Sequence, residues 1–99
     1  MKRDSRIDPA AADDISYQIA RITRGSPQNA VAFLEAVYDE LDLLADNPNL
    51  ATRVATPAGR DDYRKSVFHK SFVMYIRVEP DLIEVVRVRH VREDRGTFL

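Results

Sequence analysis

The feature that most constrains the fold of this chain is a helix-start signal that occurs twice, at Asp8-Pro9 and at Ser26-Pro27, with Gly25 just before the second. The side-chain oxygen of Asp or Ser can cap a helix, and proline suits the first helical turn because its missing N–H would have no partner there. Glycine ends a helix at low cost since it adopts left-handed backbone angles. These signals predict helices over 8–24 and 26–47. Because the link between them is short, we expect an antiparallel helical hairpin.

Apolar residues recur at spacings of three and four in both predicted helices, which gives each helix one side suited to burial. The first stripe comprises Ala12, Ile15, Ile19 and Ile22, and the second comprises Ala30, Phe33, Leu34, Val37, Leu41 and Leu44, with Tyr38 beside it. Asn47-Pro48 ends the second helix, because the residue before a proline is pushed out of helical geometry.

After a loop predicted over 47–61, the sequence changes to an extended pattern rich in Val, Ile, Phe and Tyr over 63–68, 71–78 and 82–90. His69-Lys70 and Glu79-Pro80-Asp81 supply turns, so we expect antiparallel strands within 62–90, followed by a tail over 91–99. Residues 2–7 are expected to add an edge strand. Three strands alone are marginal, so the helices should pack on one face of the sheet. The prediction is a single α+β domain over 1–99, with a helical hairpin on a mostly antiparallel sheet of three to four strands.

The composition narrows the possible functions. Hydrophobic residues make up 44% and charged residues 31% of the 99 residues, which is typical of a globular domain rather than a disordered tail. The chain has no cysteine, so it offers no disulfide, zinc-thiolate site or cysteine nucleophile. The N-terminus is polar, and no apolar run approaches the roughly 20 residues of a membrane span. We therefore expect a cytoplasmic protein that does not enter a membrane.

Several fragments, in their order along the chain, resemble the ParE/RelE toxin superfamily of type II toxin–antitoxin systems, and its ParE branch most closely. The matching fragments lie at 11–15, 27–34, 43–48, 72–78 and 83–94. The last is the most specific: it reads Ile-Glu-Val-Val-Arg-Val-Arg-His-Val-Arg-Glu-Asp, similar to the isoleucine-rich closing strand and Arg-Val-x-His-x-x-Arg signature of that superfamily. Together the fragments cover most of residues 8–94.

The resemblance implies that the chain is the toxin of a toxin–antitoxin pair of the kind associated with plasmid stabilization. It implies a hetero-oligomer with a cognate antitoxin, ParD-like or similar and encoded beside it, and no cofactor. ParE-like members poison DNA gyrase and do no chemistry themselves. RelE-like members cut mRNA on the ribosome, and this alternative stays open, as does an inactive relic that acts only as a binding and regulatory partner.

A RelE-like nuclease would need cations that hold the scissile phosphate and a residue that manages the 2′-hydroxyl proton. The candidates are His90, Arg87, Arg64 and Lys65. Strand alternation puts Arg87 on the face shared by Ile83 and Val85, together with Arg89, and puts His90 on the opposite face. A compact cluster around His90 would therefore need a bulge. The other interpretation of His90 is a strand-end residue bonded to backbone, which we favour.

Two further observations weigh against a nuclease or a metal site. No tyrosine follows Tyr75, so the late aromatic that many RelE-like nucleases use is missing, and Phe98 cannot donate a proton. His69 fits a turn better than a ligand role, and two separated histidines without cysteines make a poor metal site. We expect no catalytic residues and no bound metal.

An antitoxin is the partner that the resemblance implies, with its C-terminal segment wrapped around the helical groove and the open sheet. Grooves beside small open sheets receive partner helices, and aromatic and arginine side chains are typical anchors of interfaces. The candidate contacts are Tyr17, Phe33, Tyr38, Leu41, Arg77, Arg87 and Arg89. For the strand arginines, a purely structural role also stays open, in which the aliphatic stem covers the sheet.

Overall fold

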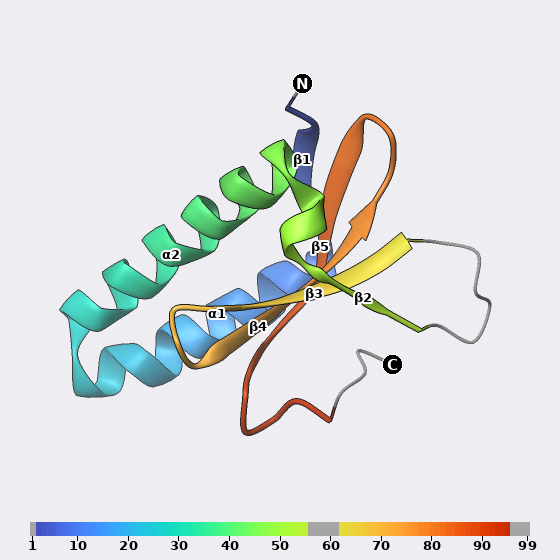
Figure 1. Cartoon of the computed structure of the whole chain (residues 1–99). Coiled ribbons are helices and arrows are strands. Elements are labelled where there is room, and N and C mark those ends of the chain that lie inside the picture. Colours follow the sequence, from blue (N-terminus) through green and yellow to red (C-terminus); the bar gives the residue numbers. More distant parts are fainter. Residues whose placement is uncertain (1, 56–61, 96–99) are drawn as a thin grey trace.

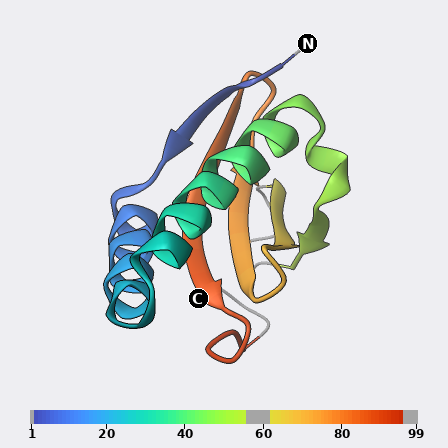
Figure 2. The same cartoon turned by 90° about the vertical axis from the view of Figure 1, so that its left-hand side faces the viewer.

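The computed structural model describes residues 2–55 and 62–95 of the chain. Its elements, in chain order, are β1 (Asp4–Ile7), α1 (Pro9–Gly25), α2 (Pro27–Asp46), a 3₁₀ turn η1 (Pro48–Leu50), β2 (Thr52–Val54), β3 (Asp62–Phe68), β4 (Phe72–Val78) and β5 (Leu82–His90). The five strands form one sheet in the order β1-β5-β4-β3-β2. Both helices lie on one side of this sheet (Figures 1 and 2), so the predicted α+β layering is confirmed.

The two predicted caps form the helical hairpin, but the predicted role of Gly25 is wrong: Gly25 is the last residue of α1 and its φ is not in the left-handed region. The Asp8 carboxylate accepts from the N–H of Ala10 at 3.0 Å, and the Ser26 hydroxyl accepts from the N–H of Asn29 at 3.2 Å. Ser26 also ends α1, since its own N–H donates to the carbonyl of Ile22. One residue thus closes the first helix and opens the second, which forces the chain to reverse.

The sheet contains the three predicted strands and two further strands. β1 lies at the edge, as expected, and it pairs with β5 in parallel from Asp4↔Leu82 to Ile7↔Val85. β2 was not predicted, because Thr52–Val54 falls inside the segment expected to be a loop. Three residues are too few to show an alternating pattern, and only the neighbouring β3 makes this segment a strand. Residues 56–61 of that predicted loop and the end of the tail with Phe98 lie outside the described residues.

A β-bulge in β5 changes the direction in which its last residues point. Tyr75 pairs with Arg87 whereas the next residue, Ile76, pairs with Val85, so Val86 is the extra residue. A bulge inserts one residue and reverses the alternation beyond it. The prediction that Arg87 and Arg89 share the face of Ile83 and Val85 is therefore wrong.

The core lies between the helical hairpin and the covered sheet face. Its largest buried members include Phe33, Leu44, Met74, Ile76, Ile83, Val85 and Val88. Phe33 packs against Phe72 with ring centroids 4.6 Å apart. Two details of the predicted stripes are wrong: Ala11 rather than Ala12 is buried in α1, and Leu34 is 36% exposed. The buried side of α1 is therefore shifted from the predicted stripe, whereas α2 buries the rest of its predicted stripe.

Candidate functional site

The uncovered sheet face carries a row of three side chains across its central strands. Lys65 on β3 lies opposite Tyr75 on β4, and Tyr75 lies opposite Arg87 on β5. Arg89 follows two residues along β5 on the same face, because alternate residues of a strand point the same way. The open face therefore presents several cations to solvent, in contrast to the apolar covered face.

Tyr75 is fully buried although it lies on the uncovered face. The Arg89 guanidinium carbon lies 5.7 Å from the centroid of the Tyr75 ring, and the phenolic hydroxyl donates to the Asp94 carboxylate. Burial and this hydrogen bond raise the pKa of Tyr75 to about 12. The phenol is therefore neutral near pH 7, and it anchors the turn after β5 rather than acting as a base.

Arg87 is held by Asp14 of α1. Its guanidinium donates two hydrogen bonds to the carboxylate, at 2.7 and 2.9 Å, and the backbone N–H of Val88 donates a third at 3.0 Å. The hydrogen bonds to Asp14 raise the pKa of Arg87 above its ordinary value, so its charge is permanent. Its side chain is still 36% exposed, which leaves room for contact with a partner.

A second ion network lies at the other end of the open face, around Glu84. Arg77 donates to one carboxylate oxygen at 3.0 Å, and Arg6 donates to the other at 2.9 Å. Burial would raise the pKa of Glu84, but the hydrogen bonds from Arg77 and Arg6 outweigh it and hold that pKa below its ordinary value. Arg77 also pairs with Glu79, so this arginine is engaged within the chain.

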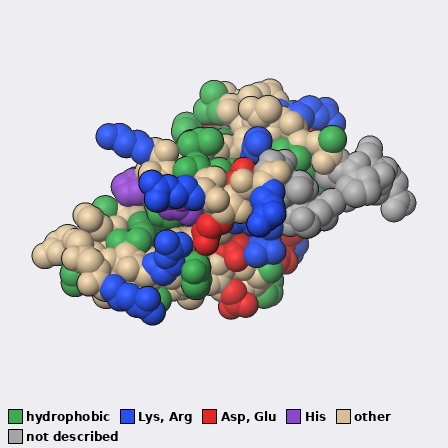
Figure 3. Space-filling view, turned by 90° about the horizontal axis from the view of Figure 1, so that it is seen from below, with side chains coloured by type: hydrophobic (Ala, Val, Ile, Leu, Met, Phe, Trp, Pro, Cys, Tyr) green, Lys and Arg blue, Asp and Glu red, His purple; other side chains and the backbone are tan. Residues whose placement is uncertain are grey.

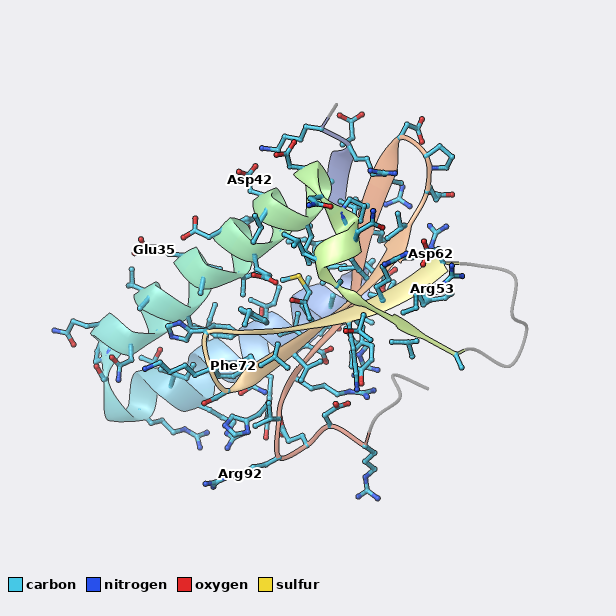
Figure 4. All side chains as sticks on the ribbon, viewed as in Figure 1. Glu35, Asp42, Arg53, Asp62, Phe72 and Arg92 are labelled. Atoms are coloured by element: carbon cyan, nitrogen blue, oxygen red, sulfur yellow. The ribbon has the colours of Figure 1, made fainter. Side chains whose placement is uncertain are left out.

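The helical side offers two of the four predicted contact residues to solvent. Tyr17 and Tyr38 are each 55% exposed, whereas Phe33 and Leu41 are buried in the core. Phe33 and Leu41 therefore cannot meet a partner unless the core opens. Val31 and Leu34 are exposed on the same helix as Tyr38, at helical spacing from it. Acidic side chains such as Glu35 and Asp42 project from α2 beside this apolar surface (Figure 4).

The four residues of the RelE-like hypothesis are not brought together. Lys65 and Arg87 share the open face, as described above. Arg64 lies opposite Ile76 on the covered face, where it donates to the carbonyl of Ala51 at 3.1 Å and to Asp62 at 3.0 Å. His90 lies opposite Phe72, farther along the covered face. The bulge that a cluster would need is present, but it turns Arg87 and His90 together and so leaves them on opposite faces.

A groove that the sequence analysis missed lies where the helical hairpin meets the turn between β3 and β4. Its lining residues are Gln18, Arg21, Ile22, Asn29, His69, Lys70, Ser71, Phe72 and His90. Figure 4 shows Phe72 beneath this turn, and Figure 3 shows Lys and Arg side chains beside the histidines on this end of the molecule. His69 and Lys70 both have positive φ, 49° and 67°. The sequence offered one signal for this groove, which is that the predicted turn at His69-Lys70 contains no glycine.

His90 is bonded to backbone, as favoured from the sequence, but it also lines this groove. The N–H of Arg92 donates to Nδ1 of His90 at 3.1 Å, so the neutral ring carries its proton on Nε2. Phe72 meets the imidazole edge to face, with centroids 5.3 Å apart.

A comparison with protein families decides which family the chain belongs to. A family model described as the ParE toxin of the type II toxin–antitoxin system parDE matches residues 6–95. The chain belongs to the ParE toxin family. No curated protein matches the sequence of this ParE-family chain.

Solved structures agree with this ParE-family fold. One is described as the chromosomal ParDE toxin–antitoxin system from P. aeruginosa; it is 16% identical, with 91% of this chain and 97% of that chain covered and a TM-score of 0.71. Another is the toxin–antitoxin complex RelBE2 from Mycobacterium tuberculosis; it is 13% identical, with 91% and 92% covered and a TM-score of 0.59. At these identities the likeness establishes the fold.

The described part of this ParE-family chain contains neither a cluster of metal-binding side chains nor a helix suited to cross a membrane. No set of three or more His, Cys, Asp or Glu side chains is grouped as a metal site would require within 2–55 and 62–95. Over the same residues, neither helix has the length and apolar character needed to cross a bilayer.

Proposed function

We propose that this toxin inhibits DNA gyrase in the cytoplasm and that a cognate antitoxin, ParD-like or similar and encoded beside it, neutralises it. The observation that carries the proposal is the match to the ParE toxin family over residues 6–95. The scattered positions of Lys65, Arg87, Arg64 and His90 support it further, because a phosphate-cleaving site needs its cations and proton carrier in one place. The toxin would then act by binding rather than by catalysis.

Two solvent-exposed surfaces support binding of an antitoxin. Tyr38 and the neighbouring apolar side chains of α2 suit an amphipathic segment, while Tyr17 lines a small pocket with Arg87 and Arg89, whose guanidinium groups suit its acidic residues. The two solved relatives are described as a toxin–antitoxin system and a toxin–antitoxin complex, which is consistent with such a partner. We propose Tyr17, Tyr38, Arg77, Arg87 and Arg89 as its contacts.

The RelE-like alternative keeps one specific observation in its favour, which is the row of Lys65, Tyr75 and Arg87 on the open face. Its test is ribosome-dependent cleavage of mRNA by the purified chain. Cleavage that Lys65→Gln or Arg87→Gln abolishes, in a variant that still folds, would favour this alternative over gyrase inhibition.

The test of the main proposal is expression of the chain without an antitoxin. We expect growth arrest together with induction of the DNA-damage response, because a poisoned gyrase leaves broken DNA. Intact DNA with an abrupt loss of translation would contradict the proposal and point to mRNA cleavage. Normal growth with soluble, folded protein would point to an inactive relic that only binds and regulates.

A further inference from the structure

We propose that the groove between the helical hairpin and the β3–β4 turn binds a mononucleotide, with its phosphate against the cations of the rim and its planar base against the apolar floor. The groove has a volume of about 640 Å³. Pockets for small ligands and cofactors have volumes of roughly 300–1,000 Å³, so a nucleotide fits in size. The site does not overlap the row on the open face, and the proposal does not depend on gyrase inhibition.

The rim of the groove is built to receive an anion. Arg21 from α1 and Lys70 from the turn supply positive charge, and no carboxylate is among the described residues that line the groove. Two further donors complete the rim, since Nδ1 of His90 accepts from the N–H of Arg92 and leaves Nε2 to donate, and Asn29 offers a side-chain amide. Charge-assisted hydrogen bonds from guanidinium and ammonium groups are typical of phosphate recognition.

One carboxylate lies beside the groove and competes for its donors. Glu93 accepts from the side-chain amide of Gln18 at 2.9 Å and from Arg21 at 3.4 Å. The Arg21–Glu93 contact is long, and both side chains are nearly half exposed, at 46% and 40%, so it is a weak ion pair. A phosphate can therefore take Arg21 from Glu93 without breaking a strong interaction.

The floor and one wall of the groove suit a planar ring. Ile22 and Phe72 supply apolar surface, and the exposed His69 ring is nearly parallel to that of Phe72, with an interplanar angle of 27°. An imidazole that is exposed on its outer side can stack with a nucleobase, since every base has a π-face. An inorganic anion would leave this apolar part of the groove unused.

The turn holds the ligand-facing side chains in a costly backbone conformation. His69 and Lys70 both lie in the left-handed region, which side chains other than Gly, Asn and Asp adopt rarely. Strained non-glycine positions cluster at ligand-binding sites, where the side chain is needed. A glycine would form this turn more easily but would give the groove neither a cation nor an aromatic ring.

The direct test is titration of the full chain with AMP, adenosine and inorganic phosphate, followed by calorimetry and by NMR shifts of the groove residues. We expect AMP to bind at least tenfold more tightly than either adenosine or phosphate, with shifts at Asn29, Ser71 and His90. Equal binding of phosphate would overturn the role of the base. Equal binding of adenosine would overturn the role of the cations, and no binding of AMP would overturn the site.

Variants separate the groove from the rest of the fold. Lys70→Asn keeps a residue that tolerates left-handed angles but removes the cation, and we expect it to weaken AMP binding about tenfold without lowering the melting temperature. Arg21→Gln should weaken binding similarly, whereas Glu93→Gln should strengthen it severalfold by releasing Arg21. Arg53→Gln removes a cation far from the groove and is the matched control. Equal affinities in all four variants would refute the proposal.

Discussion

Asp14 lies where β5 loses its strand neighbour. The pairing with β1 ends at Ile7↔Val85, and farther along β5 the N–H of Val88 donates to the Asp14 carboxylate. The same carboxylate accepts two hydrogen bonds from Arg87. One side chain of α1 thus replaces the missing strand and fixes the helix against the sheet edge.

Removal of the Asp14 carboxylate should therefore destabilise the fold, because the backbone N–H of Val88 loses its acceptor. We expect Asp14→Ala to lower the free energy of unfolding by about 2 kcal/mol, since it leaves the N–H of Val88 and the Arg87 guanidinium without their acceptor. Water screens the Arg87 part of this loss because that side chain is 36% exposed. Urea denaturation measures the change, with Asp13→Ala on the exposed neighbour as the control. Equal effects of the two substitutions would contradict this role.

Glu84 makes the stability of the fold sensitive to acid. Its pKa in the folded chain is lowered from 4.5 by Arg77 and Arg6, which outweigh the effect of burial. Its contribution to stability is therefore complete above the ordinary pKa and is lost as the pH falls toward the lowered pKa of the folded state. We expect Glu84→Gln to have a lower melting temperature than the parent at pH 7. The difference between the two melting temperatures should narrow below about pH 4.5. Melting temperatures measured across this range check the prediction; a gap independent of pH would contradict it.

At the scale of an element, the β3–β4 turn has backbone angles that are unfavourable for the residues that form it, since His69 and Lys70 both have positive φ. Left-handed angles cost a non-glycine residue roughly 1–2 kcal/mol, and a glycine loses about 0.4–1 kcal/mol through its more flexible unfolded state. We expect Lys70→Gly to raise the free energy of unfolding by about 0.5 kcal/mol, measured by urea denaturation. A loss of more than about 1 kcal/mol would mean that Lys70 stabilises the turn through its side chain.

Elements whose signals are local could be predicted from the sequence, and those that depend on a neighbouring element could not. The caps at Asp8 and Ser26 depend only on residues within one turn of helix, so the prediction of the hairpin was correct. The bulge at Val86 arises from the pairing of β5 with β4, and strand alternation alone gave the wrong face for Arg87. The three residues of β2 become a strand only because β3 lies beside them.

Some residues of the candidate surfaces could likewise be predicted from the sequence, and others could not. Tyr38 is exposed, as its position beside the second helical stripe suggested, and Tyr17 is exposed too, whereas Phe33 and Leu41 are core residues. Apolar character alone does not separate a core stripe from a contact surface. The groove brings residues of both helices to the β3–β4 turn and the end of β5, so no single segment of sequence could reveal it.

At the scale of the whole molecule, the sheet does not separate all of the proposed contacts. Tyr17 of α1 lines a small pocket together with Arg87 and Arg89 of β5, whereas Tyr38 is exposed on α2. An antitoxin segment that contacts all four residues must extend from α2 to this pocket. We expect Tyr38→Ala and Arg89→Ala each to weaken antitoxin binding more than tenfold, and Arg53→Ala to leave it unchanged. Unchanged affinity in the first two variants would place the antitoxin elsewhere.

The central claim is that this ParE-family toxin stops gyrase by binding it, and DNA supercoiling by purified gyrase tests that claim most directly. We predict that the purified chain inhibits supercoiling, that cleaved DNA accumulates, and that prior addition of the antitoxin prevents both effects. A fully active gyrase in the presence of excess folded toxin would contradict the account.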